Sequence, residues 1–153
     1  MPQRTIASPI GPLRLFSEAG HITTLRINPP PEPDLAGDDA LLDQAATQLD
    51  EYFHRRRRHF DLALAPLATP RGAALRAAIV GISYGETAQY GDLATRIGSS
   101  ARAVGQACAR NPIPLIIPCH RVLPSKGLGN YSGGGGVKTK QWLLAHEAGD
   151  LWA

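Results

Sequence analysis

The sequence feature that most limits how this chain can fold is the segment 114–122, where a short apolar run is bounded by two prolines. Residues 115–117 are apolar and mostly β-branched, which predicts a buried strand or strand-like segment. Pro118 has no backbone N–H and a fixed φ, so the chain must turn at this residue. Because Cys119 comes next, we expect a rigid scaffold to present its thiol at the end of a buried segment.

The two residues after the cysteine indicate a reactive site. A single cysteine is usually a small core hydrophobe, but His120 and Arg121 follow Cys119 directly, and such a polar pair suits a core poorly. A thiol with an ordinary pKa of about 8.5 is mostly protonated at neutral pH, so a nucleophilic cysteine needs a base. His120 is the candidate base, and we expect the carboxylate of Glu147 to orient its imidazole. Neighbouring residues of an extended segment face opposite ways, so His120 either reaches the thiol through a bend after Pro118 or acts through one water molecule.

The composition is that of a globular protein. With 153 residues, 43% of them hydrophobic and 19% charged, the chain can form one sizeable domain or two small ones. We expect an N-terminal domain over residues 1–66 and a C-terminal domain over residues 67–153. No stretch reaches the roughly 18 apolar residues of a membrane span, and no apolar signal segment is present at the N-terminus, so we expect a cytoplasmic protein with no membrane contact. Cys108 and Cys119 are expected as free thiols, and no Cys/His cluster has the spacing of a metal site.

The charge is distributed unevenly between the two halves of the chain. The net charge is +3. Residues 1–66 hold seven Lys/Arg against nine Asp/Glu, whereas residues 67–153 hold nine against four. A basic C-terminal half that carries the candidate site favours a polyanion as partner, nucleic acid first.

The N-terminal half has the pattern of a small sheet. Residues 4–28 alternate loosely between apolar and polar, with glycine-containing turns near positions 11 and 20, as in a β-hairpin or a small antiparallel meander. Apolar residues alternate again over 60–64, which predicts a strand that returns to this sheet.

One helix is expected between these strand segments. A proline-rich, extended connector over 28–33 precedes the cap residues Asp38 and Asp39, and apolar residues from 42 to 53 fall at helical spacing. The run His-Arg-Arg-Arg-Arg-His follows at 54–59. Such a run is either a nucleic-acid patch or, as is commoner at a helix end, a solvated face that compensates the helix dipole.

The C-terminal half has the pattern of a helix-turn-helix. Thr87 is expected to cap a short helix that ends at Gly98. Ser99 and Ser100 are expected to cap the next helix, over residues 101–110. Two short helices joined by a tight Gly-Ser-Ser turn form a helix-turn-helix.

Polar residues recur every four positions on the second of these helices. Arg102, Gln106 and Arg110 therefore share one face, and small residues occupy the other. A polar stripe of this kind suits DNA, but a merely solvent-exposed stripe has the same pattern, and the sequence leaves both interpretations open.

Two further helices are expected on either side of these motifs. One is capped by Thr69, and the other runs over about 137–148, where Leu143 and Glu147 share a face that points toward the site. Four consecutive glycines at 133–136 suit a place where a flat ligand approaches backbone amides closely, or else form a hinge into the last helix.

Taken together, these motifs resemble the alkylguanine-DNA alkyltransferase family, the methylated-DNA–protein-cysteine methyltransferases. The resemblance is strong from about residue 69 to 149 and weaker in the N-terminal half, where SPIGPLRL and QLDEYF also fit. The matching segments, in the expected order, are YGETAQYGDLA (84–94), ARAVGQACARNP (101–112), IPCHRV (117–122), NYSGG (130–134) and WLLAHE (142–147). The resemblance implies an α/β (α+β) fold, with a small RNase H-like N-terminal sheet-plus-helix domain and a mostly helical, winged helix-turn-helix-like C-terminal domain.

The resemblance also implies a reaction. Cys119 would attack the alkyl carbon on O6 of an alkylguanine in DNA and keep the alkyl group as a thioether, so the protein would act once, without a cofactor. His120 would take the thiol proton through a water molecule, and Glu147 would hold His120. Tyr90 would donate a proton to guanine N3, and Asn111 would brace the turn near the thiol.

Double-stranded DNA carrying O6-alkylguanine is the implied partner, bound through its minor groove by a monomer. The damaged base must leave the stack, at a cost of a few kcal/mol, and Arg102 would fill the gap. Pro114 would form a wall of the pocket, and the backbone near Val122 and Ser132 would read the guanine edges. The other residues expected at the substrate or the DNA are Ala101, Ala103, Gly105, Gln106, Arg110 and Tyr131.

The chain departs from the family pattern at several places. The loop after Cys119 is one residue shorter than usual and the glycine run before the last helix two residues longer, which bears on tolerance for bulky alkyl groups. Arg71 and Gly72 replace the usual aromatic–glutamine pair early in the helix after Thr69. The N-terminal region lacks the residues that bind zinc in some relatives, so no metal is expected.

Two other functions compete with alkyl transfer. One is a non-enzymatic DNA-binding protein that uses the helix-turn-helix as a lesion sensor or regulator and would not be alkylated. A non-catalytic branch of the family has tryptophan at the cysteine position, and the presence of Cys119 argues against membership of that branch. A cysteine hydrolase would also use a Cys–His pair, but it would turn over beyond one equivalent, and the sequence has no oxyanion-hole signature.

Overall fold

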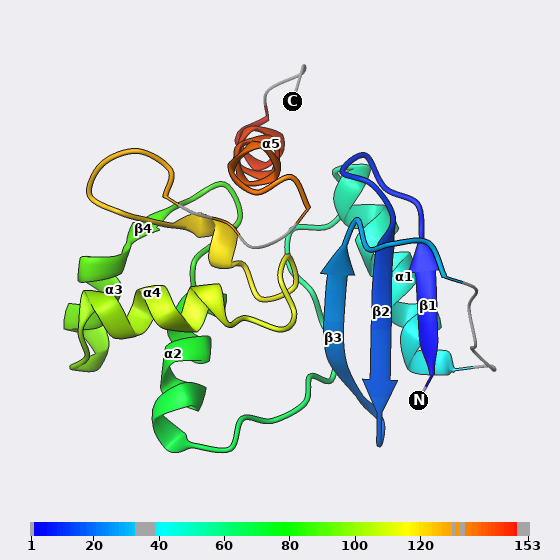
Figure 1. Cartoon of the computed structure of the whole chain (residues 1–153), viewed down its shortest axis with the longest axis horizontal. Helices are drawn as coiled ribbons and strands as arrows, with labels where there is room; N and C mark the ends of the chain where they lie inside the picture. The colour runs from blue at the N-terminus through cyan, green and yellow to red at the C-terminus, as the bar shows by residue number, and fades with distance from the viewer. Residues whose placement is uncertain (1, 33–38, 130, 132–133, 150–153) are drawn as a thin grey trace. The chain divides into compact units, whose positions relative to one another are not determined.

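The computed structural model describes residues 2–32, 39–129, 131 and 134–149. The chain divides into two compact units, Met1–Ala65 and Pro66–Ala153, and each is considered by itself (Figure 1).

In its described residues, the first unit is a three-stranded antiparallel sheet with one helix. The strands β1 (Gln3–Ile6), β2 (Leu13–Glu18) and β3 (His21–Ile27) lie in the order β1-β2-β3, so the meander is confirmed. The helix α1 (Ala40–Phe53) contacts all three strands. Its N-cap is Asp39, whose Oδ1 accepts from the backbone N–H groups of Leu41 and Leu42, at 2.9 and 3.1 Å, whereas Asp38 lies outside the described residues. The side chains that fill the core of this unit include Leu13, Leu15, Ile22, Leu42, Leu49 and Tyr52.

The predicted strand over 60–64 is reduced to a single bridge. Ile22 N donates to Ala63 O and Ala65 N donates to Ile22 O, both at 2.8 Å, which pairs Leu64 with Ile22 in parallel. The chain then reaches Pro66, which has no N–H to continue a ladder, so alternation of apolar residues did not produce a full strand. The arginine run before it forms turns and bends after α1, where Arg57 Nε donates to Glu51 Oε1 at 3.0 Å.

The second unit is mostly helical. Two short strands, β4 (Ala88–Gln89) and β5 (Val122–Leu123), pair in parallel. The helices are α2 (Pro70–Val80), α3 (Tyr90–Ile97), α4 (Ala101–Ala109), the 3-10 turn η1 (Cys119–Arg121) and α5 (Val137–Ala148).

The helix-turn-helix consists of α3 and α4. Gly98 ends α3 with a φ of 65°, a left-handed conformation that glycine adopts without strain. Ser100 Oγ then accepts from Ala103 N at 3.1 Å and caps α4.

The predicted cap of α3 at Thr87 is wrong, because the N-cap residue of this helix is Gln89. Pairing of β4 with β5 keeps the backbone extended through Gln89, and the helix can begin only after it.

The prediction of a strand over 115–117 is also wrong. The three residues are buried as expected, but Leu115 and Ile116 form a turn, and Leu115 has a φ of 76°. Ile117 N donates to Ile113 O at 2.9 Å, so the segment pairs with itself. A run of three residues between two prolines is too short to reach a neighbouring strand, and its backbone groups are satisfied locally.

In the part of the chain that the structure describes, each helix is too short or too polar to cross a lipid bilayer.

Removal of the Ser100 cap tests whether α4 depends on it. We expect Ser100→Ala to lower the free energy of unfolding of the C-terminal unit by about 1 kcal/mol, because Ala103 N loses its acceptor. Urea denaturation followed by circular dichroism measures this, with Ser99→Ala as the matched control. Equal losses from both substitutions would contradict the capping role.

Candidate active site

The reactive cysteine begins a tight turn. Cys119 is the first residue of η1 and only 4% exposed, and its backbone N–H donates to Ile117 O at 2.8 Å. Arg121 N donates to Pro118 O at 3.0 Å and closes the turn. The chain therefore bends at once after Pro118, and Cys119 and His120 do not follow the alternation of an extended segment.

Asn111 holds this turn from the end of α4. Its Nδ2 donates to Ile117 O at 2.9 Å, and its Oδ1 accepts from Ile113 N at 3.0 Å. Burial raises the pKa of the Cys119 thiol, whereas a hydrogen bond from Asn111 and the positive charge of Lys140 oppose this rise. Because burial prevails, the resting thiol is protonated and needs a base.

His120 and Glu147 lie against each other in the interior. The distance between His120 Nε2 and Glu147 Oε2 is 2.6 Å, and both side chains are almost completely buried. Burial lowers the pKa of His120 although Glu147 opposes it, so the imidazole is neutral and donates its Nε2–H to the carboxylate. The lone pair then lies on Nδ1, a buried atom with no hydrogen-bond partner in the described part of the chain. A neutral imidazole of this tautomer is ready to accept a proton at Nδ1.

Arg121 fixes the carboxylate of Glu147 from the other side. Its Nε donates to Glu147 Oε1 at 2.7 Å and its Nη2 to Oε2 at 3.1 Å. Its Nη1 donates to Ile82 O at 2.7 Å. Burial favours the neutral form of Glu147, but His120 and Arg121 together lower its pKa to about 2. The carboxylate is therefore ionised at neutral pH and held in one orientation.

A cavity of about 410 Å³ opens beside the thiol. Its volume lies in the range of ordinary small-molecule sites. Gly129, on its loop side, has a φ of 71°, and a Cβ there would lie 2.9 Å from Pro124 Cδ. The residues that line the cavity are Tyr90, Gly105, Cys108, Ala109, Cys119, Pro124, Gly129 and Tyr131.

Two tyrosines provide the polar groups of this cavity. Burial, and secondarily the charges that Cys108 and Cys119 would carry, raises the pKa of Tyr90. Burial raises the pKa of Tyr131 well above its ordinary value, and its buried hydroxyl has no hydrogen-bond partner among the described residues. Both phenols are thus protonated at neutral pH and available as donors to a ligand.

The structure gathers only some of the predicted site residues around the thiol. Tyr90, Gly105 and Tyr131 share its cavity, whereas Pro114 and Val122 are buried and do not line it. Ser132 lies outside the described residues. The remaining predicted residues belong to other faces of α4: Ala101 and Arg102 are exposed at its first turn, and Ala103, Gln106 and Arg110 line a separate pocket.

Sequence reasoning missed two residues of the site. Lys140 is 1% exposed, and its Nζ donates to Val122 O at 2.9 Å, which ties α5 to the strand after the thiol turn. Its spacing from Leu143 and Glu147 on one helix face could have indicated that it points inward. Cys108 lines the cavity, and burial chiefly raises its pKa to about 12, so it remains a thiol.

Within the described residues, no cluster of His, Cys, Asp or Glu is placed to hold a metal ion.

The buried His120–Glu147 pair predicts loss of stability in acid. His120 has a lowered folded-state pKa, so the unfolded chain binds an additional proton below the ordinary value of 6.5, and stability falls as the pH falls below it. Glu147 adds a second loss between about pH 4.5 and 2. We expect His120→Gln to remove the dependence between about pH 6.5 and 4.5, where one proton contributes a slope of up to about 1.4 kcal/mol per pH unit. Urea denaturation at several pH values measures this, with the exposed His59→Gln as control; an unchanged profile in His120→Gln would contradict it.

Comparison with known proteins identifies both parts of the chain. Residues 1–66 match the family model for the ribonuclease-like domain of 6-O-methylguanine DNA methyltransferase, and residues 73–149 match the model for its DNA-binding domain. The methylated-DNA–protein-cysteine methyltransferase of Mycobacterium tuberculosis is 40% identical over 151 residues, covering 94% of this chain and 90% of the relative. The corresponding protein of Methanosarcina barkeri is 41% identical over 156 residues, covering 95% and 96%.

Solved structures agree with this result. The crystal structure of the Mycobacterium tuberculosis O6-methylguanine methyltransferase superposes with a TM-score of 0.83 at 37% identity, covering 97% of this chain and 93% of that one. A structure of the same organism's protein in complex with DNA gives 0.83 at 38% identity, with 97% and 94% covered. The expected fold class is thereby confirmed. On both its sequence and its structure, the chain belongs to the 6-O-methylguanine DNA methyltransferase family.

Proposed function

We propose that this chain repairs DNA by moving the alkyl group of an O6-alkylguanine once, and irreversibly, onto Sγ of Cys119. The observation that carries the proposal is the thiol at the wall of a cavity, on the same short turn as a neutral histidine whose Nδ1 has no hydrogen-bond partner among the described residues. Family membership and a relative crystallised with DNA support DNA as the partner.

The proton of the thiol moves first in this mechanism. His120 Nδ1 accepts it, directly or through one water molecule, and the imidazolium is stabilised by the ionised Glu147. Arg121 keeps the carboxylate in place, and the carboxylate in turn holds the imidazole in one orientation. Asn111 and Lys140 favour the thiolate that results.

Transfer then exchanges one bond for another. The thiolate forms a bond to the alkyl carbon, the bond from that carbon to guanine O6 breaks, and its electron pair passes to the purine. Tyr90, which lines the cavity as a protonated phenol, donates a proton to guanine N3 and neutralises the leaving base. The product thioether has no easy leaving group, so each chain acts once and needs no cofactor.

The duplex reaches the site through α4. A stacked base cannot enter the cavity, so the nucleotide must rotate out of the helix. Ala101, Ala103 and Gly105 are small enough to let α4 lie close to the floor of the minor groove, and Arg102 is exposed at its first turn, where it can fill the vacated stack. A single chain carries both the helix and the thiol, so we propose a monomer. A thiol that must stay free suits the reducing cytoplasm.

Replacement of the nucleophile tests the reaction. Wild-type protein incubated with a methylated oligonucleotide should gain the mass of one methyl group per chain, measured by intact mass spectrometry. Cys119→Ala should gain nothing and still bind DNA, whereas Cys108→Ala should still gain one group. Alkylation of Cys119→Ala, or product release beyond one equivalent of protein, would overturn the proposal in favour of another nucleophile or a hydrolase.

Base rotation is tested by comparing two substrates. Arg102→Ala should slow transfer from duplex DNA by about tenfold or more and leave the reaction with free O6-benzylguanine nearly unchanged, because only the duplex must be opened. Single-turnover kinetics measures both rates. Equal losses on the two substrates would remove Arg102 from this role.

A further inference from the structure

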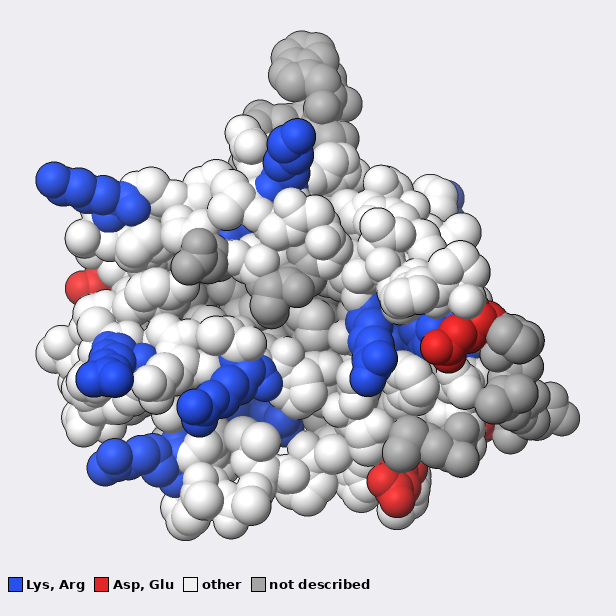
Figure 2. All heavy atoms as spheres, viewed as in Figure 1, with Lys and Arg blue, Asp and Glu red and all other residues white. Residues whose placement is uncertain are grey.

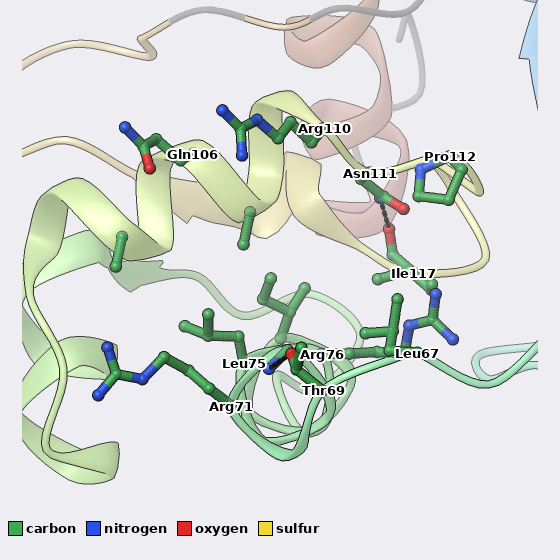
Figure 3. A pocket seen from close by; sticks show the side chains of 14 residues that line it. Leu67, Thr69, Arg71, Leu75, Arg76, Gln106, Arg110, Asn111, Pro112 and Ile117 are labelled. Atoms are coloured by element: carbon green, nitrogen blue, oxygen red, sulfur yellow. Dashed lines mark hydrogen bonds between the residues drawn. The ribbon is translucent and has the colours of Figure 1, made fainter.

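A second pocket lies between α2 and α4, away from the thiol cavity. Its volume is about 430 Å³, and Figure 3 shows Leu75 pointing from α2 toward α4 within it. Its apolar part comes from Leu67, Leu75, Ile79 and Ile117. Asn111 and Ile117, which belong to the support of the thiol turn, form one end of this pocket, and the proposed reaction gives no role to the rest of it.

The charged side chains of this pocket are all arginines. Arg71 and Arg76 come from α2 and Arg110 from the residue after α4, and no Asp or Glu is among the lining residues. In Figure 3, Arg71 extends from α2 along one side of the pocket, whereas the side chain of Arg110 lies on the side of α4 that faces away from α2 in this view. Figure 2 shows basic side chains gathered over the region where α2, α3 and α4 lie in Figure 1. The pocket is therefore an apolar hollow within a cationic surface.

The helix α4 separates this pocket from the reactive cavity. Gly105 and Cys108 line the cavity that contains the thiol, whereas Ala103, Gln106 and Ala107 line the arginine-walled pocket. These two sets lie on different flanks of one helix. A molecule that straddles α4 would therefore reach both hollows at once.

We propose that the arginine-walled pocket holds the sugar–phosphate backbone of the undamaged DNA strand; the proposal rests on the proposed function. If the damaged nucleotide enters the thiol cavity on one flank of α4, the complementary strand must pass along the other flank, because the two backbones border the same groove. Guanidinium groups bind phosphate through paired hydrogen bonds, and the apolar side chains offer a surface to the deoxyribose carbons.

This assignment gives a role to the departure from the family pattern at positions 71 and 72. The cationic Arg71 occupies the position at which the family pattern has an aromatic residue, and Gly72 adds no side chain to the pocket. The substitution thus replaces an apolar surface with a charge beside the helix that is proposed to enter the groove. Arg71 and Arg76 become DNA-binding residues in addition to those expected on α4.

The test compares duplex and single-stranded substrates. Arg71→Gln should weaken binding to a lesion-bearing duplex by about fivefold at low salt and reduce the slope of log affinity against log salt by about one. The same substitution should leave binding to the lesion-bearing single strand unchanged. Fluorescence anisotropy with labelled oligonucleotides measures both, and Lys138→Gln, an exposed basic residue on α5 outside the pocket, is the matched control.

Neutral linkages identify the strand directly. Methylphosphonates in the undamaged strand opposite the lesion should weaken binding of the wild type, and they should cause a smaller loss in Arg71→Gln, because the contact is already gone. Equal weakening of duplex and single strand would place Arg71 on the damaged strand and overturn the proposal, as would a loss no larger than that of Lys138→Gln.

Two controls separate this proposal from the others. Arg71→Gln should react with free O6-benzylguanine at the rate of the wild type. If the wild type itself does not react with this substrate, the proposed function is refuted. If the wild type reacts and Arg71→Gln binds the duplex normally, only the proposed role of the second pocket is refuted. Arg76→Gln is a second variant of the same pocket. Because Arg76 is partly buried, its substitution can impair folding, and in that case the test depends on Arg71→Gln, since Arg71 is exposed.

Discussion

The rest of the C-terminal unit depends on the hydrogen bonds that the buried carboxylate of Glu147 accepts. The carboxylate accepts from His120 on one side and from Arg121 on the other, and Arg121 also donates to Ile82 O. One buried charge thereby joins the last helix, the thiol turn and the segment after α2. Removal of the carboxylate would leave a buried guanidinium without its counter-charge, which commonly costs about 3–5 kcal/mol. The same contact selects the imidazole tautomer, so stability and proton transfer share one set of bonds.

Local signals in the sequence were sufficient for features that are determined within a few residues. The caps at Thr69 and Ser100 and the left-handed glycine at 98 depend on atoms at most a few positions away, and they lie where they were predicted. The segments 60–64 and 115–117 depended instead on a distant strand to pair with. Such a partner cannot be read from the local pattern. The apolar, β-branched run correctly indicated that residues 115–117 are buried, but neither pattern produced the regular strand pairing that was expected.

The candidate site shows the same division between local and tertiary information. The chemistry that a nucleophilic thiol needs nominated Cys119, His120 and Glu147 before any family resemblance, and the structure brings the last two into contact across 27 positions. The tie from Lys140 to Val122 was missed, because a lysine on a helix is normally solvated and only the tertiary structure shows that this one is buried. The pocket on the other flank of α4 was likewise not deducible, since arginines 71, 76 and 110 come to line one pocket only after α2 has packed against α4.

Gly129 limits how this protein can diversify. Any side chain at this position would strike the ring of Pro124, and the φ of 71° would strain the backbone as well. The hydroxyl of Tyr90 lies 3.7 Å from the same point, so an added Cβ would also contact a residue that lines the cavity. Selection for bulkier adducts therefore cannot gain space by substitution at residue 129 and must act on the other residues that line the cavity or on the length of the loop.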